Sequence, residues 1–165
     1  MGKILTYLAA LTLAFLPLFS SCNTGGCVDM RSSTPRADFY SASTRTKITV
    51  DSLQITGIGA RGDSVLYADN QRLTQVYLPM PPEVDQVSWR IAYMQSELAQ
   101  VGIADTLSYS FERYPWFAGE DCGAMFRYRI TEMHYTTNII DSVALVDSLV
   151  VNVDTPVFNI YFRTE

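Results

Sequence analysis

The sequence is short of histidine, cysteine and basic residues, and each shortage excludes a class of function. One histidine, His134, and three cysteines among 165 residues cannot supply a zinc site built from several histidine and cysteine ligands. The formal net charge is −5, whereas a protein that binds nucleic acid needs a basic stripe to displace counterions from the phosphates. We therefore expect no metal, no cofactor and no nucleic-acid partner.

The N-terminus has the layout of a lipoprotein signal peptide. Lys3 precedes an apolar run from Ile4 to Phe19, which is too short for a membrane-spanning helix. The small residues Ser20 and Ser21 then stand directly before Cys22, as in a bacterial lipobox, where the leader is removed and the cysteine is acylated. The alternative is an ordinary signal peptide cut near Ser21, which would leave Cys22 as a disulfide partner.

The lipoprotein interpretation divides the chain into three parts. Residues 1–21 are the signal peptide, residues 22–35 are a lipidated tether rich in glycine, serine and threonine, and residues 36–165 are the folded domain. After the signal peptide no apolar run reaches the length of a transmembrane helix. The lipid on Cys22 would therefore be the whole membrane attachment.

With Cys22 lipidated, Cys27 and Cys122 remain, and two thiols in an exported protein predict a disulfide. The bond would hold the N-terminal segment against the sheet and stabilise the fold by closing a long loop. The alternative is a reactive, low-pKa thiol at Cys122. The neighbouring carboxylates of Glu120 and Asp121 argue against it, because they would raise the pKa of that thiol.

Apolar and polar residues alternate along most of the chain, which is the period of β-strands. The clearest strands are 87–93, 107–111 and 126–130, and 95–101 is either a short helix or a loop. The pattern predicts a single antiparallel β-sandwich of immunoglobulin-like or Greek-key type with about seven to ten strands, and a closed β-barrel is the alternative. Shorter β-rich runs cover 37–40, 48–55, 65–67, 75–78, 143–146, 149–153 and 157–162.

A series of short motifs runs through the mature chain in a fixed order and spacing. They are Cys27, Thr34-Pro35, Phe39-Tyr40, Leu78-Pro79, Asp105-Thr106-Leu107, Tyr109, Glu112-Arg113, Pro115, Cys122-Gly123, His134, Thr136-Thr137-Asn138, Ile140-Asp141-Ser142 and Asn159-Ile160-Tyr161-Phe162. Together they resemble the small Bacteroidota lipoproteins grouped as domain of unknown function 6452. The resemblance implies an exported, lipid-anchored β domain of the cell envelope, and it brings no activity, cofactor or catalytic residue.

The residues after Cys22 bear on the sorting of the protein. Surface-exposed lipoproteins of that phylum often carry acidic residues just after the lipidated cysteine. Here Asn23-Thr24-Gly25 follow, which favours the periplasmic face of the outer membrane over the cell surface.

Five tripeptides resemble the Bacteroidota signal for O-glycosylation, an aspartate followed by serine or threonine and then a small or aliphatic residue. Chance predicts about one such tripeptide in this composition. The same order also suits an aspartate that ends a turn, a hydroxyl on the polar face of a strand and an aliphatic residue that points inward. The candidate acceptors are Ser52, Ser64, Thr106, Ser142 and Ser148.

The candidate binding loop is the aromatic segment that contains Tyr114, Trp116 and Phe117, next to Pro115 and Gly119. Aromatic side chains in such a loop can stack on sugars or fill a pocket of a partner. Alternatively, they fold back over the end of the sandwich.

We expect an outer-membrane lipoprotein that is not an enzyme and that acts as an envelope interaction or accessory module. Its partner would be an envelope protein or a glycan, and the alternative function is a carbohydrate-binding module of a glycan-utilisation system. An enzyme would need carboxylates of shifted pKa in a cleft, and the sequence nominates no such pair and no catalytic residue.

Overall fold

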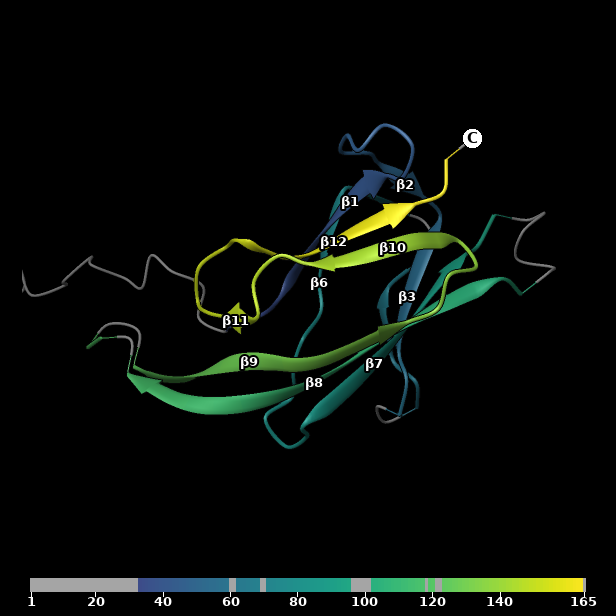
Figure 1. Ribbon diagram of the computed structural model, residues 1–165. Coiled ribbons are helices and arrows are strands. Elements are labelled where there is room, and N and C mark those ends of the chain that lie inside the picture. The colour runs from purple at the N-terminus through teal and green to yellow at the C-terminus, as the bar shows by residue number, and fades with distance from the viewer. Residues whose placement is uncertain are drawn as a thin grey trace, which may run out of the picture.

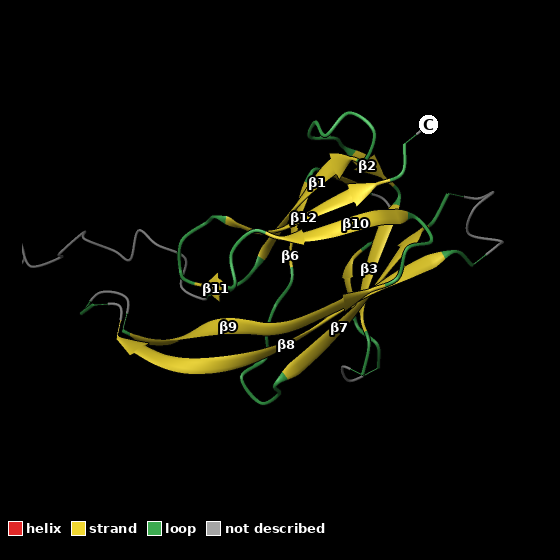
Figure 2. Ribbon diagram, in the orientation of Figure 1, coloured by secondary structure: helices red, strands yellow, loops and turns green. Residues whose placement is uncertain are grey.

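The computed structural model describes residues 33–59, 62–68, 71–95, 102–117, 119–120 and 123–164. Every regular element within these ranges is a β-strand (Figure 2). The strands are β1 (Arg36–Ser41), β2 (Val50–Asp51), β3 (Leu53–Gly57), β4 (Val65–Tyr67), β5 (Arg72–Leu73), β6 (Gln75–Tyr77), β7 (Gln86–Tyr93), β8 (Ala104–Phe117), β9 (Ala124–Tyr135), β10 (Ile140–Leu145), β11 (Leu149–Val150) and β12 (Pro156–Phe162). Of the predicted helix or loop at 95–101, only Gln95 lies within the described residues, and it forms a bend.

The strands form the two layers of a sandwich, which confirms the predicted fold class, although the described ranges contain twelve strands rather than about seven to ten. A six-stranded sheet has the order β11-β9-β8-β7-β3-β4, and a four-stranded sheet with the order β10-β12-β1-β6 lies over it (Figure 1). The short strands β2 and β5 pair separately. Within the described ranges neither sheet closes on itself, so the barrel alternative is wrong.

One strand pair departs from the predicted antiparallel arrangement. The first strand, β1, pairs in parallel with the last, β12, with Phe39 opposite Ile160, whereas all the other strand pairs are antiparallel. Parallel neighbours need a long connection, and here nearly the whole domain separates the two strands. The predicted strand 48–55 is also interrupted, because Ser52 has a φ of 55°, in the left-handed region.

The core lies where the inward residues of the two sheets meet. On β8 every second residue is buried as far as Phe111, and Tyr109 packs against Phe158 of β12 with their ring centroids 5.1 Å apart. Phe39 of β1 makes an edge contact with Phe162 over the same distance, 5.1 Å. Alternation along the strands therefore fills the sandwich with aromatic and aliphatic side chains, as the sequence pattern predicts.

A buried carboxylate joins the two sheets. Asp105 of β8 is 1% exposed, and it accepts hydrogen bonds from the backbone N–H groups of Asn138, Ile139 and Ile140 at 2.6–2.8 Å and from the Thr136 hydroxyl at 2.5 Å. These donors lie in the segment through which the chain passes from β9 in one sheet to β10 in the other. Burial alone would raise the pKa of Asp105, but these hydrogen bonds outweigh it and lower the pKa.

Asp105→Asn should therefore destabilise the fold by about 3 kcal/mol, because an amide nitrogen would face N–H donors inside the protein. Denaturant unfolding at neutral pH measures this loss. Since the folded pKa is lowered, the stabilisation by Asp105 is fully present above the unfolded pKa of about 3.9 and is lost as the pH falls through the folded pKa. The exposed Asp51→Asn is the control, and an equal loss in both variants would contradict the assigned role.

Candidate functional site

The two longest strands, β8 and β9, extend beyond the sandwich as an arm, which we define as residues 112–117 and 124–129. Its base, at Tyr128 and Arg129, also pairs with β11, and beyond that base the arm is two-stranded. In the arm Glu112 lies opposite Arg129 at one end and Phe117 opposite Ala124 at the other. In the connection between the two strands, the Gly123 N–H donates to the Gly119 carbonyl at 2.8 Å. The alternation of buried and exposed residues on β8 stops at the arm, where all of 112–117 are exposed. Figure 1 shows this hairpin curving away from the four-stranded sheet.

The arm has two faces with different chemistry, because cross-strand neighbours point to the same side of a strand pair. The inner face continues the core side of the six-stranded sheet. It is made of Arg113, Pro115, Phe117, Phe126 and Tyr128, whereas the outer face is made of Glu112, Tyr114, Trp116, Met125, Arg127 and Arg129.

On the outer face an arginine stacks on a tryptophan. The guanidinium carbon of Arg127 lies 3.6 Å from the ring centroid of Trp116, a cation–π contact, and Trp116 stays 43% exposed. The Tyr114 hydroxyl donates to the Glu112 carboxylate. The outer face therefore combines two aromatic rings with charged groups.

On the inner face aromatic rings continue from the core into solvent. Phe111 makes an edge contact with Tyr128 at 5.4 Å, and Tyr128 lies 6.4 Å from Phe126, measured between ring centroids. Phe126 is 40% exposed and Phe117 is 65% exposed. Phe126 lies on the core side of the six-stranded sheet but is exposed, because β9 enters the sandwich only after this residue.

The base of the arm is attached to the connection between β6 and β7. Tyr128 is buried, and its hydroxyl donates to the Met80 carbonyl at 3.3 Å, while Arg113 donates to the Pro82 carbonyl. Burial raises the pKa of the Tyr128 phenol, and the charge of Arg113 partly offsets the effect. These contacts fix the direction in which the arm leaves the sandwich.

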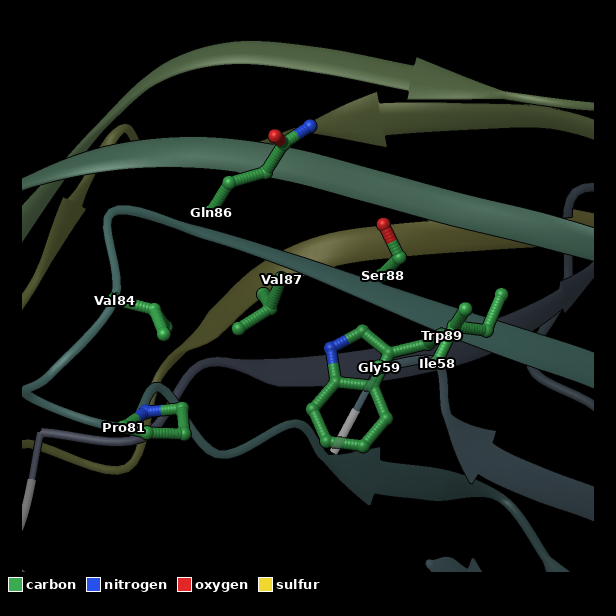
Figure 3. Close-up of a pocket in the computed structure, with 8 residues that line it drawn as sticks. All are labelled: Ile58, Gly59, Pro81, Val84, Gln86, Val87, Ser88 and Trp89. Atoms are coloured by element: carbon green, nitrogen blue, oxygen red, sulfur yellow. The ribbon is translucent and has the colours of Figure 1, made fainter. Parts of the chain in front are cut away.

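Beside this base lies a pocket of about 130 Å³ (Figure 3). Val87 and Trp89 of β7 point toward it, and Pro81 and Val84 form one wall. The Trp89 N–H donates to the buried Tyr109 hydroxyl at 3.3 Å, which leaves the indole ring as an apolar surface. The pocket is well below the size of a usual ligand site and could hold a single apolar side chain.

A scan against protein-family models matches residues 52–162 to a family of unknown function, DUF6452. The chain belongs to this family. No curated protein and no solved structure matches the chain. The region shared with DUF6452 runs from just before β3 to the end of β12, so it contains the whole arm and the Asp105 network.

In this DUF6452 member the aromatic residues predicted to form a binding loop lie in a regular strand. Tyr114, Trp116 and Phe117 belong to β8, and the structure leaves them exposed rather than folded over the end of the sandwich. The lipidation site Cys22 and the disulfide partners Cys27 and Cys122 lie outside the described residues.

The candidate glycosylation sites have different environments. Ser64 is exposed before β4, and Ser148 is half-buried in the turn before β11. Ser52, with its positive φ, separates β2 from β3. Thr106 and Ser142 are half-buried within β8 and β10.

The described residues include no group of three or more histidine, cysteine, aspartate or glutamate side chains that could hold a metal. His134 lies near the end of β9, where its Nε2 is 2.9 Å from a carboxylate oxygen of Glu132 in an exposed pair. The described ranges also contain no helix long and apolar enough to cross a membrane.

Sequence reasoning missed two buried carboxylates. Asp105 is on the same side of β8 as the buried Leu107 and Tyr109. The alternation of residues along this strand could therefore have predicted its burial. Asp38 is buried on β1, where it accepts from Arg36 Nε at 2.9 Å and Lys47 Nζ at 2.6 Å. The hydrogen bond to Asp38 raises the pKa of Lys47. No sequence signal indicated this second cluster.

Phe117→Ala should lower the free energy of unfolding by no more than about 0.5 kcal/mol, because the side chain is mostly exposed. Phe111→Ala, six residues earlier on the same strand and buried, should cost about 3–5 kcal/mol. Chemical denaturation of both variants checks the difference. A large loss in Phe117→Ala would show that the arm packs against the domain and is not a free surface.

Proposed function

We propose that this DUF6452 member is a non-enzymatic, lipid-anchored accessory module of the outer membrane that contacts other envelope components through its arm. The observation that carries the proposal is the exposure of Tyr114, Trp116, Phe117 and Phe126 on one regular strand pair outside the core. Exposed aromatic clusters are rare on surfaces without a partner. Binding surfaces are in turn enriched in tryptophan, tyrosine and arginine.

The arm suits contact through side chains better than the addition of a further strand. Pro115 lies in β8 opposite Phe126, and its missing N–H removes a donor from the outer edge of the strand. The two buried carboxylates support a binding role over a catalytic one, because Asp105 and Asp38 are already engaged by hydrogen bonds and cations.

We include in the proposal a periplasmic orientation and a disulfide between Cys27 and Cys122.

The lipid anchor is tested by Cys22→Ala. The variant should either stay unprocessed or appear in the soluble fraction, because the thiol that carries the acyl chains is gone. Fractionation and intact-mass spectrometry of protein from the native host measure both outcomes. If the variant remained membrane-bound at the mature mass, the anchor would lie elsewhere.

A carbohydrate-binding module is the second candidate, favoured by the presence of Tyr114 and Trp116 on one face of the arm. A sugar platform needs neighbouring free ring faces, and Arg127 already covers one face of the Trp116 ring. Phe117 and Phe126 lie on the opposite face of the arm. This separation favours contact with an envelope surface over a glycan platform.

Photo-crosslinking in the native host tests the binding role of the arm. A photoreactive phenylalanine analogue at position 117 should give discrete adducts, whereas the same analogue at Tyr135 should not. Tyr135 is the matched control because it is an exposed aromatic residue on β9 outside the arm. Equal labelling from both positions, or none from position 117, would contradict a role for the arm in binding.

A further inference from the structure

The chain enters the sandwich at the end from which the arm extends. Ser33 is buried just before β1, and Arg36 at the start of β1 donates to Asp154 at 2.8 Å in the connection between β11 and β12. Strand β11 in turn pairs with Tyr128 and Arg129 at the base of the arm. Figure 1 shows β11 and the start of β1 on the side of the arm.

We propose that the arm lies on the surface of the bilayer that holds the lipid anchor, and that its binding partner is an interface of anionic phospholipid headgroups. The inference rests on the proposed function, since it names the partner of the same surface. It predicts a second, non-covalent membrane contact that fixes the orientation of the sandwich relative to the membrane.

The length of the chain before Ser33 permits this contact. Eleven residues lead from Cys22 to Ser33, and an extended chain of that length spans at most about 40 Å. Six residues of strand make the arm about 20 Å long, well within that reach. The predicted disulfide would shorten the path, because Cys27 is five residues after Cys22 and Cys122 lies in the connection between β8 and β9.

The chemistry of the arm matches a lipid–water interface. Tryptophan and tyrosine rings favour the headgroup level, and Tyr114 and Trp116 lie together on the outer face of the arm. Arginine stems lie along apolar surface while the guanidinium binds phosphate, so Arg127 and Arg129, both on the outer face of the arm, are placed to contact headgroups. Within the arm Glu112 is the opposing charge, whereas the whole chain has a net charge of −5.

Acidic residues after the end of β8 limit how the arm can be oriented on the membrane. Glu120 is exposed beyond the end of β8, and Asp121 follows it in the sequence. A carboxylate is repelled by anionic headgroups and is costly to bury in lipid. The arm is therefore expected to lie along the bilayer with its outer face in contact, rather than to enter it end-on.

The two tryptophans of the chain make the test selective. In Trp89→Phe the remaining tryptophan is Trp116 on the arm, and in Trp116→Phe it is Trp89, which is 8% exposed. Each lipid-anchored variant is reconstituted in vesicles of phosphatidylethanolamine and phosphatidylglycerol with acyl chains brominated near the headgroup. The Trp116 emission should shift to the blue and lose roughly half of its intensity, and the Trp89 emission should not change.

The charge dependence provides the second measurement. Arg129→Gln should reduce the quenching of Trp116 in these vesicles, whereas Arg72→Gln, an exposed arginine on β5, should not. Unquenched Trp116 emission, or quenching equal to that of Trp89, would overturn the membrane contact. Discrete protein adducts from position 117 together with unquenched Trp116 would leave the proposed function in place and reject the lipid surface as its partner.

Discussion

The buried carboxylate of Asp105 is the contact on which the arrangement of the two sheets depends. An ionised carboxylate inside a protein is tolerated only when donors surround it, and here they come from a single segment, residues 136–140. That segment is where the chain leaves the six-stranded sheet for the four-stranded one. Fixing it sets the position of β10 relative to β8, and with it the space that the aromatic core fills.

One part of the hairpin formed by β8 and β9 lies in the sandwich, and the other part is exposed to solvent. Its inner half forms the centre of the six-stranded sheet, and its outer half forms the arm. Because the strands are continuous, the strand pairing of the sheet extends to Trp116 and Phe117. Paired strands have less conformational entropy to lose on binding than a loose loop, which favours recognition by this regular strand pair.

Period-two alternation was enough to predict the sandwich and most of its inward residues, because one face of each strand must be apolar. It could not predict where a strand leaves the core. Phe126 and Phe117 continue the same apolar pattern as Phe111, and only the end of the opposing sheet makes them exposed. The parallel pairing of β1 with β12 was equally out of reach, since local pattern carries no information on which distant strands become neighbours.

The position of β12 has a consequence for how the protein is made. Strand β12 lies between β1 and β10, so β10 is not joined to β1 and β6 in the four-stranded sheet until β12 is present. The lipid anchor that we propose requires export, and a chain exported from its N-terminus would hold no complete sandwich while any of β12 remained behind. Its strands would therefore leave the inner membrane unfolded, and the two sides of the four-stranded sheet would be joined only after the seven residues of β12 arrived.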